Sequence, residues 1–158
     1  MRYITLLILA IFLIYGLYKN QLKNNKFMTY FFYWYVLTVI TITLLPIHLE
    51  YYQPAFDGSV RINLIPFHDL HQSYGGAFDN IIYNIMMFIP LGMFLGYFKK
   101  NTYFALFTIV NASICIEFLQ LYFSYLHIMN RSYDVTDLIT NIFGGIIGYC
   151  FYNLFCKR

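Results

Sequence analysis

The apolar residues of the chain fall into five long runs that are separated by polar segments. The runs cover residues 3–18, 27–48, 80–98, 102–126 and 138–156. A helix that crosses the hydrocarbon core of a bilayer needs roughly 20 predominantly apolar residues. The runs therefore predict an all-α membrane protein, a bundle of about five transmembrane helices joined by mostly short connections.

The composition agrees with a chain that is embedded in a membrane. Of 158 residues, 60% are hydrophobic and 11% are charged, whereas soluble domains carry about 25% charged residues. These values exclude an ordinary cytosolic globular protein, a disordered tail and a nucleic-acid binder with a dense basic face. We divide the chain into residues 1–26, the first transmembrane helix with a basic cytoplasmic loop, and residues 27–158, a polytopic membrane domain.

The first run follows Arg2, as the apolar part of a signal peptide would follow a basic residue. The small residues of a cleavage site are missing after it, so we expect a retained helix. The second run begins in an aromatic block, residues 30–35, which suits a membrane interface. Residues 49–79 form the only long polar stretch, and we interpret them as one loop. The segment 65–70 within this loop predicts a short interfacial or re-entrant helix, because it is apolar enough to lie on the membrane.

The basic residues predict the orientation, because short cytoplasmic loops retain Lys and Arg. If the loop after the first run is cytoplasmic, seven of the ten basic residues lie inside and three lie outside. The inner residues are Lys19, Lys23, Lys26, Lys99, Lys100, Lys157 and Arg158, and the outer ones are Arg2, Arg61 and Arg131. We expect a multi-pass protein of the cell membrane with its N-terminus outside and its C-terminus in the cytoplasm. The loop of residues 49–79 is then external.

Glu117 is the only ionisable residue deep inside a predicted span. A charged side chain at that depth costs roughly 2.5 to 3.5 kcal/mol on insertion scales and is usually kept for a partner or a function. It belongs to a polar stripe whose members follow one another at helical spacing along one face. The members of the stripe are Ser113, Glu117, Gln120 and Ser124.

Two further runs carry matching polar faces. Their members are Asp137, Asn141, Gly145 and Gly148 in the fifth run, and Asn80 and Asn84 in the third. Because lipid offers no hydrogen bonds, we expect these faces to pack together around a polar crevice that opens outward.

The polar groups allow two interpretations. In the first they only hold helices together, with Glu117 protonated or paired. In the second they form a ligand or catalytic pocket that includes Glu117, Arg131, Asp134 and Asp137. We favour the second, because packing alone seldom needs so many polar groups from so few helices. Arg131 itself either extends to the lipid head groups and pairs with Asp134, or binds a lipid phosphate or carboxylate.

Two other patterns are less specific. Gly144 and Gly148 have the small-xxx-small spacing, which we interpret as packing within the bundle. His68, Asp69 and His71 offer ligands to a metal, but no further ligand is identifiable in the sequence. We therefore favour an interfacial histidine pair and expect no metal. Neither a nucleotide-binding loop nor a recognisable nucleophile motif is present, and we expect no cofactor.

Four stretches carry a similarity to a known family. They are residues 63–67 (NLIPF), residues 80–92 with Asn80, Asn84 and the segment FIPLG, residues 116–120 (IEFLQ), and residues 131–145 from RSYDVTDL to the glycine pair. In this order and spacing they resemble the VanZ-like family of small bacterial membrane proteins. The similarity covers about residues 40–150 and does not include the first run. It implies a polytopic envelope protein of the kind linked to resistance toward teicoplanin-type glycopeptides, which act on peptidoglycan precursors at the outer surface.

We expect a protein that binds, or alters access to, a lipid-linked or cell-wall component at the outer face. Its expected partners are membrane lipids, together with a lipid-linked peptidoglycan precursor or a glycopeptide antibiotic, and not nucleic acid. The expected site residues are Glu117 and Gln120 on the floor of the crevice, Asn84 and Asn141 on its walls, Arg131, Asp134 and Asp137 at its mouth, and Asn80 one turn from Asn84.

Two alternatives to simple binding stay open. One is an enzyme in which Glu117 or Asp137 is a general acid or base for chemistry on a lipid head group, since a carboxylate in apolar surroundings can have a pKa suited to that role. The other is a small proton-coupled transporter. A lipid found in the crevice would favour a binding protein or an enzyme over a transporter. Turnover of that lipid would distinguish the enzyme from the binding protein.

Overall fold

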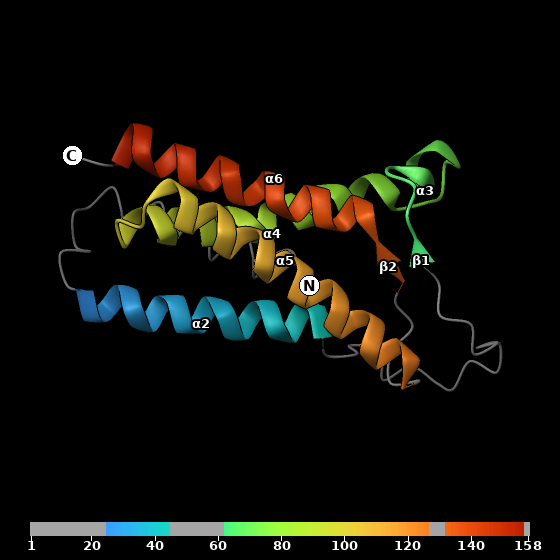
Figure 1. Ribbon diagram of the computed structural model, residues 1–158, viewed down its shortest axis with the longest axis horizontal. Coiled ribbons are helices and arrows are strands. Elements are labelled where there is room, and N and C mark those ends of the chain that lie inside the picture. The colour runs from blue at the N-terminus through green and yellow to red at the C-terminus, as the bar shows by residue number, and fades with distance from the viewer. Residues whose placement is uncertain (1–24, 45–61, 127–131, 157–158) are drawn as a thin grey trace.

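The computed structural model describes residues 25–44, 62–126 and 132–156. Four long helices lie side by side, and two short strands with one short helix are gathered at one end of the bundle (Figure 1). The elements in chain order are α2 (Asn25–Leu44), β1 (Ile62–Asn63), α3 (His68–His71), α4 (Ala77–Tyr97), α5 (Thr102–Tyr125), β2 (Tyr133–Asp134), α6 (Val135–Phe151) and the π-helical turn η2 (Tyr152–Cys156).

Three of the described helices are long and apolar enough to cross a membrane, namely α4, α5 and α6 with its continuation η2. The apolar part of α2, Met28–Leu44, is shorter. The predicted class, a helical membrane bundle, is confirmed. The first predicted span, residues 3–18, lies outside the described residues. The predicted domain boundary, between residues 26 and 27, falls in the first turn of α2 and stays a prediction.

Two helices begin with polar side chains that cap the free N–H groups of the first turn. Asn101 Oδ1 accepts a hydrogen bond from the Phe104 N–H at 2.7 Å, where α5 begins. Asp134 Oδ1 accepts one from the Thr136 N–H at 2.7 Å, where α6 begins. The apolar run that predicts this last helix starts only at residue 138, because the first turn of α6 is polar and carries no hydrophobic signal.

Glycines allow α4 and α6 to pack backbone against backbone. A Cβ atom added at Gly144 would collide with the Ile85 backbone, and one added at Gly148 would collide with the Ile89 backbone. Gly92 of α4 meets the α6 backbone in the same way. The small-xxx-small pair therefore packs within the bundle, as its spacing predicted, and it fixes α6 along α4.

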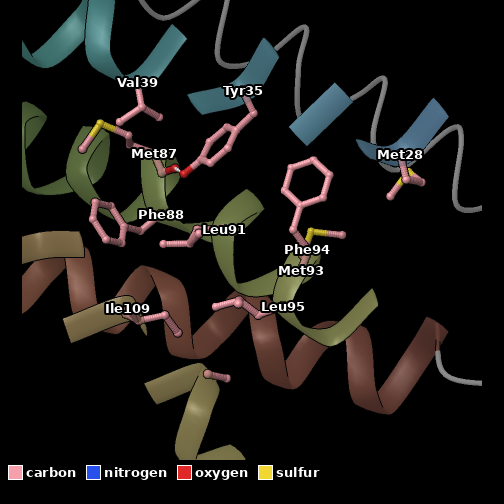
Figure 2. Packing of buried hydrophobic residues seen from close by; sticks show 11 residues of the cluster. Met28, Tyr35, Val39, Met87, Phe88, Leu91, Met93, Phe94, Leu95 and Ile109 are labelled. Carbon is pink, nitrogen blue, oxygen red and sulfur yellow. Dashed lines mark hydrogen bonds between the residues drawn. The ribbon is translucent and has the colours of Figure 1, made fainter. Parts of the chain in front are cut away.

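The helix α2 covers the other side of α4 through an aromatic core (Figure 2). Tyr35 is buried and its hydroxyl donates a hydrogen bond to the Met87 carbonyl at 2.8 Å. The rings of Phe32 and Phe94 meet edge to face at 5.2 Å between centroids. The aromatic block of residues 30–35 therefore lies partly in the core. Tyr35 faces α4 and lies in the protein core, and the interface location of the block stays a prediction.

The segment of residues 62–76, which we call the strap, lies across one end of the bundle, and α6 begins beside it (Figure 1). Its strand β1 pairs in parallel with β2, with Ile62 opposite Tyr133 and Asn63 opposite Asp134. The predicted short helix is present as α3, and it covers residues 68–71 instead of 65–70. Pro66 and Phe67 form a turn before it, and Phe67 has a left-handed backbone conformation, with φ of 58°, so the helix begins only at His68.

Candidate functional site

Asp134 joins the strap to the start of α6. Its Oδ1 atom caps the helix, as described above, and its Oδ2 atom accepts a hydrogen bond from Asn63 Nδ2 at 3.1 Å. The side chain is 7% exposed, so both bonds form away from bulk water. One carboxylate thus holds a helix N-terminus and a strand from a distant part of the sequence.

Thr136 provides a second attachment for the strap. Its hydroxyl oxygen accepts a hydrogen bond from the Phe67 N–H at 2.9 Å. Phe67 has a left-handed backbone conformation, and this bond satisfies its N–H group in that conformation. The strap is therefore fixed to the first turn of α6 both before and after its residues 64–66.

Asp137 connects α6 with α4. Its Oδ1 atom accepts a hydrogen bond from Asn84 Nδ2 at 2.6 Å. Both side chains are half-buried. Sequence spacing placed these two residues on polar faces of separate helices, and the structure brings those faces together at this pair.

A small open cavity of about 70 Å³ lies between the strap, the start of α4 and the start of α6. Its polar lining residues are Asp69, Asn80, Ser132, Asp134, Thr136 and Asp137, and its apolar ones are Phe67, Leu70, Ala77 and Ile81. None of these described lining residues is Lys, Arg or His. Carboxylate, amide and hydroxyl oxygens accept hydrogen bonds, so the cavity suits a group rich in donors, such as hydroxyls, amide N–H groups or an ammonium.

Glu117 lies behind this cavity in the interior of the bundle. It is 1% exposed, and its Oε2 atom accepts a hydrogen bond from the Asp134 N–H at 3.4 Å. The carboxyl group therefore contacts the backbone of the residue that organises the site, but it is not among the residues that line the cavity. All four members of its stripe are buried, as the spacing predicted: Ser113, Glu117, Gln120 and Ser124.

Two other expected site residues are buried and are not among the residues that line the cavity. Gln120 Nε2 donates a hydrogen bond to the Thr43 carbonyl of α2 at 3.2 Å, so this amide joins α5 to α2. Asn141 is 1% exposed, and within the described part of the chain its Oδ1 atom has no hydrogen-bond partner. Arg131, expected at the mouth, lies outside the described residues.

The site also contains residues that were not among the expected site residues of the crevice. Asn63, Phe67, Thr136 and Asp69 all contribute to the attachment of the strap or to the cavity. Asn63 and Phe67 are the first and last residues of the stretch NLIPF, so the family motif contained a signal for them. Thr136 lies between two acidic residues, and nothing in its local pattern indicates its contact with Phe67.

The histidines of α3 make local contacts. His68 Nδ1 lies 3.3 Å from Asp69 Oδ1, and His71 Nδ1 lies 2.8 Å from the Phe67 carbonyl oxygen, to which it can donate. Within the described residues, no group of three His, Cys, Asp or Glu side chains is arranged to hold a metal ion.

Comparison with known proteins agrees with the similarity found in the motifs. The profile of the VanZ/LLP1 family matches residues 30–156. Protein VanZ of Enterococcus faecium is 33% identical over 99 residues, which make up 61% of this chain and 55% of that relative. The alignment thus spans about half the length of the curated relative. No solved structure matches the chain. Because the family profile covers most of α2 and every described element after it, the chain belongs to the VanZ/LLP1 family.

Proposed function

We propose that this chain is a multi-pass protein of the bacterial cell membrane that binds a lipid-linked or cell-wall component at the outer face. Binding alters the access of other molecules, such as glycopeptide drugs, to that component, and resistance to teicoplanin-type glycopeptides is the expected consequence. The observation that carries the proposal is the acceptor-rich cavity between the strap, Asn80 and Asp137. Lipid-linked cell-wall precursors present sugar hydroxyls and peptide N–H groups, which are the donors that such a lining binds.

The charge distribution supports an outward-facing cavity. Seven of the ten basic residues fall in segments that become cytoplasmic when the N-terminus is outside, including Lys99 and Lys100 between α4 and α5. The cavity lies at the start of α4, and this helix is long enough to cross the hydrocarbon core. A membrane-spanning α4 puts the cavity and the two lysines on opposite sides of the membrane, which supports our proposal that the cavity is external.

Family membership supports the resistance role, and a membrane location is the reason we expect lipid-tailed drugs to be affected most. A buried acyl tail contributes roughly 0.8 kcal/mol per CH₂ group to membrane binding, so the activity of such a drug depends strongly on its lipid surroundings. A protein that occupies or shields the precursor at the membrane surface disturbs a membrane-anchored drug more directly than it disturbs a drug that binds from water.

The test is expression in a susceptible Gram-positive host. The protein is expected to raise the minimal inhibitory concentration of teicoplanin more than that of vancomycin, and Arg131→Ala is expected to abolish the effect at unchanged membrane levels. Equal susceptibility with and without well-expressed protein would contradict the resistance role.

Mass spectrometry of copurified lipids tests the binding step directly. A precursor or a specific lipid is expected with the wild-type protein and not with a variant of the cavity. Chemical conversion of that lipid during incubation with purified protein would assign an enzyme in place of a binding protein.

A further inference from the structure

The strap presents an apolar tip, residues 64–66, that the protein holds away from its own core. Leu64 is 65% exposed and Ile65 is 62% exposed, and Pro66 is exposed as well. The tip is attached on both sides, because Asn63 bonds to Asp134 and the Phe67 N–H bonds to Thr136. The outward position of these apolar side chains is therefore fixed by the fold.

The position of the strap in the chain places this tip at the edge of the membrane. The strap ends at residue 76 and α4 begins at Ala77. The 21 residues of α4 extend over about 32 Å at ~1.5 Å per residue, close to the thickness of the hydrocarbon core. A helix of this length uses the whole core, so the strap lies in the head-group layer immediately outside it.

Exposed aromatic side chains mark the same boundary. Tyr74 in the strap, Phe78 in the first turn of α4 and Tyr125 at the end of α5 are all exposed. Tyr side chains are enriched where a membrane protein passes from hydrocarbon to water. Leu70 of the strap is exposed as well, so exposed apolar side chains continue from the first turn of α4 into the strap, among exposed polar residues such as Ser73 and Asp79.

The composition of the strap fits lipid as its partner. Residues 62–76 contain no Lys or Arg, and Asp69 is their one acidic residue. An apolar surface with so little charge offers few charged groups that could pair with a charged protein partner. The boundary between head groups and acyl chains, in contrast, accepts apolar side chains beside polar backbone.

We infer that the tip of the strap, Leu64 to Pro66, inserts into the lipid interface and thereby holds the cavity at the depth of the head groups. Phe67, which follows the tip, lines the cavity. A ligand that enters the cavity therefore comes from the head-group layer, which makes it a lipid head group or the linked head of a membrane-bound precursor. This last step on the ligand rests on the proposed function, whereas the insertion of the tip does not.

Fluorescence quenching in proteoliposomes tests the insertion. The chain has one tryptophan, Trp34, so Trp34→Phe gives a background in which Leu64→Trp and Ile65→Trp each carry a single probe. The quenchers are phosphatidylcholines brominated near the head-group end of the acyl chain or near its far end, and aqueous iodide. The wild-type protein is the matched reference, because Trp34 is exposed in the middle of α2 and is expected to respond most to the deep bromines.

Both tip probes are expected to be quenched at least about twofold more by the shallow bromines than by the deep ones, with little quenching by iodide, as for side chains buried ~5–10 Å into the interface. Quenching by iodide alone would show a tip in water. No quenching by either agent would show a tip covered by protein, a second copy included. Stronger quenching by the deep bromines would place the tip in the core. Each of these three results overturns the inference.

The result of the quenching experiment can be distinguished from the results that test the proposed function. Quenching at the tip with no copurified lipid and no drug tolerance would leave the insertion established and the proposed function refuted. The converse pattern, tolerance without quenching, would refute the insertion alone.

Discussion

Asn84 Nδ2 donates a hydrogen bond to Asp137 Oδ1 across a distance of 2.6 Å, and this bond joins α4 to α6 beside the cavity. Asp137 also lines the cavity, so one carboxylate both holds two helices together and faces the proposed ligand. The two roles can be separated by changing the charge without changing the shape.

Asp137→Asn is expected to abolish drug tolerance and lipid copurification while the membrane level of the protein stays unchanged. The amide keeps an oxygen that accepts the bond from Asn84 but removes the negative charge from the cavity. The measurements are the minimal inhibitory concentration of teicoplanin and the amount of protein in the membrane. Wild-type tolerance in Asp137→Asn would assign this residue to helix packing alone.

Two variants of Glu117 distinguish a functional role of its carboxylate from a purely structural one. Glu117→Gln is expected to insert and fold like wild type and to lose function, because it keeps the size and an oxygen for the Asp134 N–H but not the charge. Glu117→Ala is expected to lower the folded yield as well, since a buried group left without its partner costs about 1–3 kcal/mol. If Glu117→Gln were fully functional and only Glu117→Ala lost yield, the residue would serve packing alone.

Gly148→Ala is expected to destabilise the protein by roughly 1–3 kcal/mol, the usual cost of overpacking a tight contact. Its new methyl group would collide with the Ile89 backbone and force α6 away from α4. The measurement is the apparent melting temperature in detergent. Gly75→Ala is the matched control, because an added Cβ at Gly75 meets nothing within 4 Å. Equal melting temperatures for the two variants would show that close α4–α6 packing does not limit stability.

Much of the bundle follows from the periodicity of the sequence. The spacing of Ser113, Glu117, Gln120 and Ser124 predicted one buried face, and all four side chains are buried. Helical geometry fixes which residues share a face, but it does not fix which neighbour that face contacts. Gln120 accordingly belongs to the predicted face and yet bonds to Thr43 of α2, and neither residue lines the cavity.

The attachment of the strap could not be predicted from local patterns. The strands β1 and β2 are two residues each, too short for any alternation to show, and Asn63 meets Asp134 across 71 positions of the sequence. The contact depends on how α4, α5 and α6 are packed, because that packing brings the two loops to the same end of the bundle. Only the family motif marked Asn63, and a motif identifies a residue without identifying its partner.

The orientation of the chain predicts two different reactions with an impermeant thiol reagent on intact cells. In a background without Cys115, Cys150 and Cys156, Ser59→Cys is expected to react and Asn101→Cys is not. Ser59 lies outside the described residues, in the loop that is external when the N-terminus is outside. Asn101 caps α5, and loss of a cap costs about 0.5–2 kcal/mol, so the membrane level of that variant is measured in parallel. The reverse labelling pattern would place the cavity in the cytoplasm.

The attachment of the strap predicts an energetic coupling between Asn63 and Asp134. Asp134→Ala removes the cap of α6 and the bond to Asn63, and is expected to cost about 0.5–2 kcal/mol for the cap alone. Asn63→Ala removes the same inter-loop bond, so the double variant is expected to lose less than the two single variants together, with a coupling energy of about 0.5–3 kcal/mol.

Apparent melting temperatures of the four proteins in this cycle measure that coupling. A second cycle that combines Asn63→Ala with Asn153→Ala is the matched control. Asn153 Nδ2 bonds to the Tyr149 carbonyl in the last turn of α6 and η2, at the opposite end of the bundle (Figure 1). Distant sites without shared partners add within about 0.3–0.5 kcal/mol. Additive effects in both cycles would show that the bond between Asn63 and Asp134 does not hold the strap, and the fixed position of its tip would then need another cause.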